Sequence, residues 1–370
     1  MRVTIDAVPL LFRSAGVKNY LHYWIEHLRG AAKGTEIRLF PWITNLPSLN
    51  HEASIADPVT THLRVGMWFL MNRIAGLEQL LGSSDIFHST KLLRPPRGAR
   101  LTATLYDCTC WLMPEMHAAT NVAFESQFAE RILRRADGLI AISENTRQDA
   151  VRVLGLPPEK IHVIYPGVPT SFFEVTPEMA GAVVSRYGLT RPYVLFVGTI
   201  EPRKNVDLLL DAYAALPAST RAEYELVLAG PEGWASPKTR ARLQTPPAGI
   251  RYLGYVGEAD LAGLYAGATA FVYPSLYEGF GFPVAQAMAA GVPVVTSNLS
   301  SLPEITGGAA LLTDPRSEGE LREALNRILT SSSVRATLKQ QARPIAARYS
   351  WAECASQSVR FFEDVAGTRV

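Results

Sequence analysis

One stretch, YPSLYEGFGFPVAQAMAAG at residues 273–291, limits what this chain can fold into more than any other. The apolar run Ala270–Tyr273 is typical of a strand, the loop that follows carries Glu278 and two glycines, and Pro283 opens a helical pattern. A strand, a glycine-bearing loop and a helix N-terminus in this order leave backbone N–H groups free to bind an anion, above all phosphate. Gln286 lies eight residues after Glu278, so we expect a carboxylate and an amide near one ligand. The alternative is an ordinary strand-loop-helix of an α/β protein.

The same order of strand, glycine, loop and helix occurs earlier, in VLFVGTIEPRKNVDLLL at residues 194–210. Gly198 ends the strand with minimal bulk, and Arg203 and Lys204 come just before the helix. Arginine binds phosphate oxygens in pairs and lysine adds a point charge, so this dipeptide suits a diphosphate that departs with extra negative charge. A solvent-exposed basic pair is the alternative interpretation.

Length and composition restrict the class of protein. A chain of 370 residues suits about two domains, and 48% hydrophobic with 19% charged residues is typical of a soluble globular protein. The net charge of +2 argues against nucleic acid as a partner. Cys108, Cys110 and Cys354 are too few and too scattered for a disulfide framework or a four-cysteine zinc site, which favours a reducing cytoplasm. The sequence contains no run of 18 apolar residues, so no membrane-spanning helix is expected. The N-terminus shows no signal-peptide pattern. Contact with a membrane surface stays open.

Strand and helix patterns alternate along the chain, which predicts parallel sheets covered by helices. We expect an N-terminal domain at residues 1–170, a linker at 171–190 where the periodicity lapses, and a second domain at 191–350. The last helix, at 351–365, is expected to pack back on the first domain.

These motifs resemble those of the retaining glycosyltransferases of family 4. EGFGFPVAQAMA is similar to the family's E-x7-E region, PRKN matches its phosphate-binding dipeptide, and the resemblance extends from Val3 to about Glu363. It implies the GT-B fold, an α/β architecture of two doubly wound, Rossmann-like domains facing a central cleft. The first domain would hold the acceptor and the second would hold a nucleoside diphosphate sugar.

The resemblance also assigns roles in the second domain. Glu278 would orient the sugar hydroxyls, while Arg203 and Lys204 would stabilise the departing diphosphate. The donor would be bound by Gly198, Thr199, Val256, Gly279, Phe280, Gly281 and Gln286. The family has a glutamate where this chain has Gln286, and the weaker acceptor predicts lower donor affinity or a changed preference rather than inactivity.

In the first domain the resemblance implies an acceptor side formed by Gly16, Asn19, His88 and Tyr106. A lone histidine such as His88 is more often a core residue, and the Gly16 loop is equally consistent with a turn that binds nothing. Tyr106 stands where relatives have a histidine, and a phenol is a poor proton acceptor at neutral pH. A proton would therefore pass to Asp107, which we count with the catalytic residues, or to a phosphate oxygen.

Two further features of the first half stay open. Lys91, Arg94, Arg97 and Arg100 place four positive charges in ten residues, which suits a lipid surface or a lipid pyrophosphate acceptor, although a solvated loop is the favoured interpretation. The helical pattern from Val65 to Leu81 is apolar nearly all round, which favours a core helix over a lipid-facing or acceptor-facing one.

The expected reaction is transfer of a hexose, with mannose as first choice, to a glycan or lipid-linked saccharide in surface polysaccharide synthesis. The donor is a nucleoside diphosphate sugar, a GDP-sugar in preference to a UDP-sugar. No cofactor and no metal are expected, because no DxD run with suitable flanks occurs. A nucleotide-sugar epimerase and a catalytically degenerate nucleotide-binding protein are the alternatives, and acceptor-dependent release of the diphosphate would separate all three.

Overall fold

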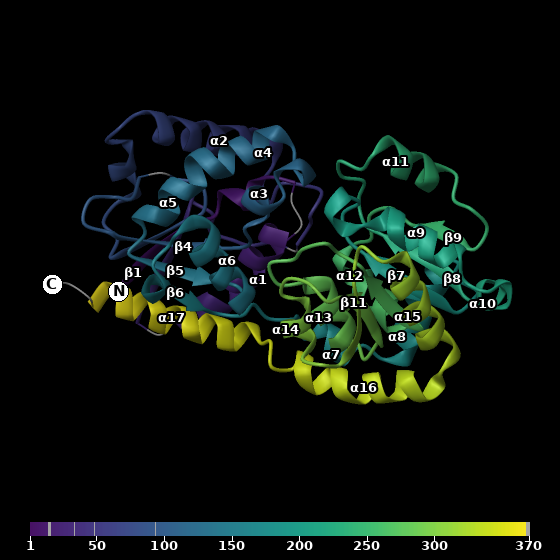
Figure 1. Cartoon of the computed structure of the whole chain (residues 1–370). Helices are drawn as coiled ribbons and strands as arrows, with labels where there is room; N and C mark the ends of the chain where they lie inside the picture. The colour runs from purple at the N-terminus through teal and green to yellow at the C-terminus, as the bar shows by residue number, and fades with distance from the viewer. Residues whose placement is uncertain (14–15, 33, 48, 93, 368–370) are drawn as a thin grey trace. The chain divides into compact units, whose positions relative to one another are not determined.

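The structure, a computed structural model, describes residues 1–13, 16–32, 34–47, 49–92 and 94–367. The chain forms two compact units (Figure 1). Unit 1 contains Met1–Gly167 and Ser350–Val370, and unit 2 contains Val168–Tyr349.

Unit 1 is built on a six-stranded parallel sheet with the order β2-β1-β3-β4-β5-β6. Its strands are short and largely buried, as expected when helices cover both faces of a parallel sheet. The strands are β1 (Arg2–Asp6), β2 (Glu36–Phe40), β3 (Ile86–Ser89), β4 (Arg100–Leu105), β5 (Gly138–Ala141) and β6 (Ile161–Val163). The helices are α1 (Gly16–Ala31), α2 (Pro58–Arg73), α3 (Thr109–Leu112), α4 (Ala119–Phe124), α5 (Glu130–Arg135), α6 (Glu144–Leu154) and α17 (Trp351–Gly367), with one-turn helices η1 (Val8–Leu11), η2 (Leu77–Leu81), η3 (Pro114–Met116) and η5 (Pro158–Lys160) and a π-turn η4 (Glu125–Ala129).

Unit 2 repeats this architecture with a six-stranded parallel sheet of order β12-β11-β10-β7-β8-β9. The strands are β7 (Tyr193–Val197), β8 (Glu225–Ala229), β9 (Ile250–Tyr252), β10 (Ala270–Tyr273), β11 (Val294–Ser297) and β12 (Ala310–Thr313). The helices are α7 (Ser171–Glu174), α8 (Pro177–Arg186), η6 (Pro202–Lys204), α9 (Val206–Ala214), α10 (Ala218–Glu223), α11 (Pro237–Gln244), α12 (Glu258–Ala266), α13 (Phe282–Ala289), α14 (Leu302–Thr306), α15 (Glu318–Thr330) and α16 (Ser332–Ala346). In both sheets the strand order reverses beside the first strand, and ligands of such sheets bind where the strands end.

The C-terminal helix α17 belongs to unit 1, where it packs along α1 (Figure 1). The indole Nε1 of Trp24 donates to the Ser358 hydroxyl at 2.9 Å. Gly138 at the start of β5 leaves room for the helix, because a Cβ there would lie 2.7 Å from Val365. The end of the chain therefore completes the core of the N-terminal unit.

Two segments differ from what the sequence predicts. Residues 171–190, expected as a linker, form α7 and α8 and belong to unit 2. Helix α8 packs on α12, where a Cβ on Gly263 would lie 2.6 Å from the side chain of Val183. The segment from Val65 to Leu81, expected as one core helix, is divided into α2 and η2, and in α2 only Met71 is fully buried. One face of α2 packs on the core through Met67, Trp68 and Met71. Apolar composition alone did not reveal that Val59, Leu63, Phe69 and Leu70 of the same helix are exposed.

Candidate active site

Glu278 lies in the loop after β10, and its carboxylate is surrounded by donors. Oε1 accepts hydrogen bonds from the Lys204 ammonium at 2.6 Å and from the Ser275 hydroxyl at 2.6 Å. Oε2 lies 3.2 Å from Nη1 of Arg203. All three charged side chains are at least 87% buried, so this is a desolvated ion cluster rather than a surface pair.

The electrostatics of the cluster favour the ionised carboxylate. Burial alone would raise the pKa of Glu278, but the charges of Lys204 and Arg203, with hydrogen bonds from Lys204 and Ser275, outweigh it and lower the pKa to about 2. Burial and the neighbouring Arg203 lower the pKa of Lys204, and Glu278 and Glu201 oppose that shift. At neutral pH Glu278 is therefore a hydrogen-bond acceptor and not an acid.

Backbone contacts bring the two sequence motifs together. The amide of Leu276 donates to the Arg203 carbonyl at 2.9 Å, and the Arg203 guanidinium donates to the Tyr277 carbonyl at 2.5 Å. Asn205 has a positive φ of 59°, which asparagine tolerates, and its amide donates to the Pro274 carbonyl at 3.2 Å. These hydrogen bonds hold the η6 turn and the Glu278 loop together.

Glu201 is a member of this cluster that sequence reasoning missed. Its Oε1 lies 2.7 Å from Nη2 of Arg203 and 3.9 Å from the Lys204 ammonium, and the residue is 6% exposed. Two carboxylates therefore balance two cations. The available signal was an acid placed two residues before the arginine in E-P-R-K, at the end of the same strand-loop unit.

The N-terminus of α13 has the shape that the glycines predict. Gly281 is the N-cap with φ 99°, and a Cβ there would lie 2.8 Å from Leu302. The Ser301 hydroxyl lies 3.0 and 2.9 Å from the carbonyl oxygens of Glu278 and Phe280, and the amide of Glu278 donates to Ser300 Oγ at 3.0 Å. The β11–α14 loop therefore holds the glycine loop that contains Gly279 in place.

Gln286 lies in α13 one turn below this loop and is 6% exposed. Its Oε1 accepts from the Tyr265 hydroxyl of α12 at 3.4 Å. Among the described residues, no hydrogen bond joins Gln286 to Glu278. The amide is therefore held by α12 and is not part of the ion cluster.

The remaining predicted donor residues line strand ends of unit 2. Gly198 follows β7, Thr199 comes next, and Val256 lies just before α12. A Cβ on Gly198 would meet side chains only at 3.6 Å, which is ordinary contact, so the packing of the chain does not itself require glycine there. This free space is what close approach of a ligand needs.

Unit 1 has a cavity of about 320 Å³ at the carboxyl ends of its strands. Tyr106 and Asp107, which follow β4, line it, and so do Thr90 and Lys91, which follow β3. Asp6 positions the latter segment, because its buried carboxylate accepts from the amides of Lys91 at 2.6 Å and Leu92 at 2.8 Å. The cavity is a preformed pocket of unit 1.

Tyr106 and Asp107 differ in how free they are to act on a ligand. The Tyr106 hydroxyl is buried and has no hydrogen-bond partner among the described residues, and burial raises its pKa above the usual value. Asp107 Oδ1 accepts from the amide and the hydroxyl of Thr109, at 3.0 and 2.6 Å. The phenol is thus a donor that lacks a partner, while half of the Asp107 carboxylate already holds the start of α3.

Glu125 also lines this cavity, and the sequence analysis did not identify it. Burial raises its pKa to about 7, with Lys91 opposing and Asp107 adding to the shift. It lies in the π-turn η4, an irregularity that is often found at functional sites. The sequence gives no signal for a π-turn, so only the structure identifies this carboxyl.

The other acceptor-side predictions fare differently. His88 is fully buried, its ring nitrogens lie 3.0 Å from the hydroxyls of Thr102 and Thr104, and burial lowers its pKa to about 3. It is a neutral core residue that supports the pocket through Thr104, not one that lines it. Asn19 is buried in α1 with its side-chain N–H group unpartnered among the described residues, and Gly16 begins that helix.

The described residues contain neither a cluster of metal ligands nor a membrane-spanning helix. No three His, Cys, Asp or Glu side chains of that part of the chain gather as metal ligands do. None of its helices is long and apolar enough to cross a membrane.

Two family models match the chain, one for each unit. Residues 15–172 match Glycosyltransferase Family 4, and residues 184–344 match Glycosyl transferases group 1. The O-antigen chain mannosyltransferase B of Escherichia coli is 30% identical over 379 residues, an alignment that covers 98% of this chain and all of that protein.

Solved structures share the fold at lower identity. The glycosyltransferase WaaG, involved in lipopolysaccharide biosynthesis, matches with a TM-score of 0.73 at 16% identity, over 97% of this chain and 98% of its own. HepE of Anabaena, in complex with UDP and glucose, matches with a TM-score of 0.72 at 19% identity, over 97% and 98%. These matches and the two parallel sheets confirm the GT-B fold class. The chain belongs to the glycosyltransferases of family 4 and is a glycosyl-transferring enzyme.

Proposed function

We propose that this enzyme transfers mannose from GDP-mannose to a hydroxyl of a glycan or lipid-linked saccharide, with retention of the anomeric configuration, during surface polysaccharide synthesis. The observation that carries this proposal is the buried cluster of Glu278, Arg203 and Lys204 beside the N-terminus of α13. The choice of mannose and of a surface polysaccharide rests on the mannosyltransferase named above.

The cluster suits a sugar diphosphate because its polar groups are only partly used. A carboxylate has about four acceptor positions, and Glu278 uses three of them on Lys204, Ser275 and Arg203. The remaining position can accept one sugar hydroxyl. The two cations, with the N–H groups of the glycine loop, stabilise the charge that develops as the bond between the anomeric carbon and the diphosphate breaks.

In this proposal, unit 1 binds the acceptor substrate. The acceptor hydroxyl bonds to the anomeric carbon, and its proton passes to the departing diphosphate or to Asp107. Tyr106 donates a hydrogen bond to the acceptor, since its hydroxyl has no partner in the described part of the chain. No metal ion and no cofactor enter the proposed reaction. We also propose that it takes place in the cytoplasm, against the inner face of a membrane.

The first test is ligand-induced thermal stabilisation with GDP, UDP, ADP and dTDP and their sugar conjugates, since a ligand that binds only the folded protein raises its stability by RT ln(1 + [L]/Kd). GDP and GDP-mannose are expected to give the largest shift. Release of GDP that depends on an added glycan acceptor, with an α-linked product from the α-linked donor by NMR, would support retaining transfer. Release of an altered sugar nucleotide without acceptor would identify an epimerase, and no shift with any nucleotide would contradict the proposal.

A further inference from the structure

Glu125 is a carboxyl that a helical segment contributes to the strand-end cavity of unit 1. It lies in the π-turn η4 between α4 and α5, whereas Tyr106 and Asp107 belong to the loop after β4. A π-turn interrupts regular α-helix and is frequent at functional sites. The turn therefore adds a carboxyl to a cavity that the strand ends line with a phenol and a second carboxyl.

The two carboxyls of this cavity differ in their hydrogen bonds. Asp107 Oδ1 accepts from the amide and the hydroxyl of Thr109, at 3.0 and 2.6 Å. In the part of the chain that the structure describes, the Glu125 carboxyl forms no hydrogen bond and no ion pair. A carboxyl that is enclosed without a partner loses hydration, and a ligand that carries a hydroxyl group can offset this cost. Both oxygens of Glu125 are therefore available to a ligand in the cavity.

Aromatic side chains also line the cavity, namely Phe12 and Trp111. The Trp111 indole donates to Oε2 of Glu130 at 3.3 Å, which fixes the ring, and Trp111 packs against the core of unit 1. The Lys91 ammonium lies 5.9 Å from the centre of the Phe12 ring. Apolar rings with a few polar groups between them are typical of a small-molecule site. This combination suits a sugar, which has apolar C–H faces and a polar edge of hydroxyl groups.

The electrostatics of the cavity set Glu125 apart from Tyr106. Burial raises the pKa of Glu125, Lys91 lowers it and Asp107 raises it, and the result is about 7. At neutral pH Glu125 is therefore found in both protonation states. Burial raises the pKa of Tyr106, and the charges of Asp6 and Glu125 add to this, so the phenol keeps its proton. A group that takes a proton in a reaction works best when its pKa lies near the working pH.

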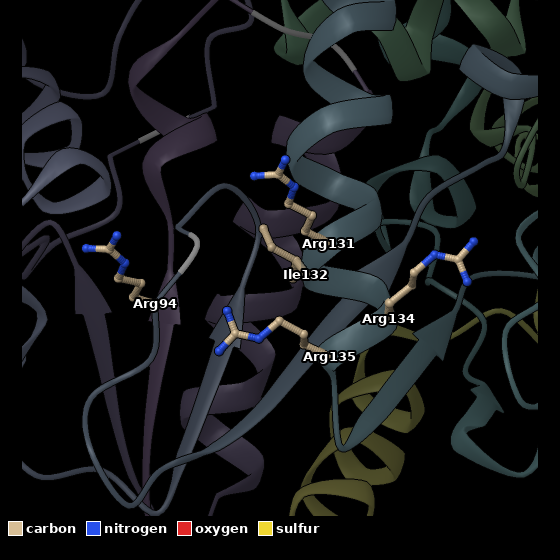
Figure 2. A pocket seen from close by; sticks show the side chains of 5 residues that line it. All are labelled: Arg94, Arg131, Ile132, Arg134 and Arg135. Atoms are coloured by element: carbon tan, nitrogen blue, oxygen red, sulfur yellow. The ribbon is translucent and has the colours of Figure 1, made fainter. Parts of the chain in front are cut away.

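Other titratable groups also surround η4. The rest of the cavity lining contains Arg13, which pairs with Glu52 at 2.7 Å, and also Cys110 of α3 and His117. Helix α4 contains no titratable residue in its sequence ATNVAF. On α5, Glu130 pairs with Arg134 at 2.8 Å. The arginines of α5 line a different cavity together with Arg94 (Figure 2), namely Arg131, Arg134 and Arg135. Lys91 and Asp107 are thus the charges that act on Glu125.

We propose that Glu125 binds the hydroxyl of the acceptor in the strand-end cavity and takes its proton during transfer. This inference rests on the proposed function, because it concerns the acceptor of that reaction. The acceptor oxygen forms a bond to the anomeric carbon, the bond between that carbon and the diphosphate breaks, and its electron pair leaves with the diphosphate. The proton of the hydroxyl goes to an oxygen of Glu125. Asp107 instead holds the start of α3 through Thr109.

The test is the pH dependence of kcat/KM for a mannotriose acceptor, with GDP-mannose kept saturating. This constant reports groups of the enzyme before the acceptor binds, so in the wild type it should rise with pH and level off above about pH 7. Glu125→Gln cannot take a proton, so we expect its plateau to fall roughly a hundredfold and the rise with pH to disappear. Glu125→Asp keeps a carboxyl and should keep the rise at a lower rate.

Two further variants separate Glu125 from the carboxyls near it. Glu115→Gln changes an exposed side chain of η3 and should leave the rate and the pH profile unchanged. Asp107→Asn removes a negative charge that raises the pKa of Glu125, so the rise should persist and move to lower pH. If the rise instead disappears in Asp107→Asn and persists in Glu125→Gln, the proton goes to Asp107 and the inference is wrong.

Thermal stabilisation by GDP is measured for each variant alongside transfer. Glu125→Gln should bind GDP as the wild type does, because Glu125 belongs to unit 1 and the proposed donor residues belong to unit 2. Wild-type rate and pH profile in Glu125→Gln would overturn the inference and leave the proposed function intact. Absence of transfer by the wild type to mannotriose would overturn the proposed function, and this role of Glu125 with it.

Discussion

Glu278 shows how one carboxylate can serve both stability and chemistry. It is buried, and three donors hold it ionised. Removing one member of such a buried group leaves the others without compensation, which costs far more than losing a surface ion pair. In the proposed reaction, the same surroundings would give the donor sugar a hydrogen-bond acceptor whose position is fixed in advance.

Replacing Glu278 with Gln is expected to abolish most transfer activity and to destabilise unit 2 by roughly 3 kcal/mol at pH 7. Because the folded pKa is lowered to about 2 from 4.5, the stabilisation is full above about pH 4.5 and is lost as the pH falls toward 2. Denaturant unfolding across this range should therefore show the gap between wild type and variant closing. Glu318→Gln, at an exposed ion pair with Arg322, should cost below about 1 kcal/mol. A gap independent of pH would contradict the assignment.

Glu125 should show the opposite dependence on pH. Its folded pKa is raised from 4.5 to about 7, so the folded protein holds a proton that the unfolded chain releases, and stability falls as pH rises through this range. Glu125→Gln cannot lose that proton. Its melting temperature should exceed that of the wild type at pH 8 and approach it at pH 4. Glu115→Gln, at an exposed carboxyl nearby, should show no such trend, and an equal trend in both would refute the prediction.

Two glycines of unit 2 are expected to respond differently to alanine. Gly198→Ala should leave folding intact but weaken nucleotide binding roughly tenfold, because the Cβ would occupy space that the chain leaves open. Gly230→Ala should destabilise unit 2 by about 4 kcal/mol or more, since φ is 137° and the Cβ would lie 2.1 Å from the Gly198 carbonyl oxygen. Melting curves and nucleotide titration measure the two effects. Equal loss of stability in both variants would show that position 198 is structural.

At the scale of elements, α17 shows that the end of the chain is part of the first unit. Its Trp351, Phe361 and Phe362 are buried, and Trp351 lies so close to Gly167 that a Cβ there would be 2.1 Å from its amide nitrogen. The helix therefore contributes to the core of unit 1 and is not a surface attachment. Helix α2 is the contrasting case, because Met71 packs in the core while Val59, Leu63 and Leu70 of the same helix are exposed.

Ser358→Ala in α17 is expected to cost about 1 to 3 kcal/mol in the unfolding of unit 1. The mutation removes the only described acceptor of the buried Trp24 indole N–H, so that donor loses its partner. Thermal unfolding followed by tryptophan fluorescence measures this cost. Ser356→Ala, two residues away and bonded to the exposed Arg360, should change stability by less than about 0.5 kcal/mol. If the two variants are equally stable, the indole bond does not hold α17 in place.

At the scale of the whole molecule, each unit has its own sheet and its own core, so each can respond to a ligand separately. All the donor-side residues belong to unit 2, and the strand-end cavity belongs entirely to unit 1. In the proposed function, nucleotide affinity is therefore a property of unit 2, and acceptor preference is a property of unit 1.

Calorimetry of the full chain with saturating GDP should therefore raise the unfolding temperature of unit 2 in particular. At a hundredfold excess over Kd the gain is about 2.7 kcal/mol, which corresponds to roughly 5 °C or more for a unit of this size. Residues 168–349 expressed alone should bind GDP with similar affinity. Binding that needs residues of unit 1, or an equal shift of every transition, would contradict the division.

Residue type and spacing are enough to predict the parts of this protein that depend on local order along the chain. Strand, glycine loop and helix N-terminus are consecutive, so Gly198, Gly281 and the Arg203–Lys204 pair could be predicted from residue type and spacing. The same holds for the two α/β sheets, because buried parallel strands are continuous apolar runs. The register of neighbouring strands within each sheet could not be predicted in this way.

The other features depend on tertiary packing, because the burial and the partners of a side chain come from segments that are distant in the chain. Glu201 belongs to the cluster because η6 and the Glu278 loop are joined across 74 residues. His88 is neutral because the core encloses it, and the pKa of Glu125 is raised because its π-turn buries it beside Asp107. The apolar pattern of α2 is the same whether the helix is inside or outside, and which side it occupies depends on what packs against it.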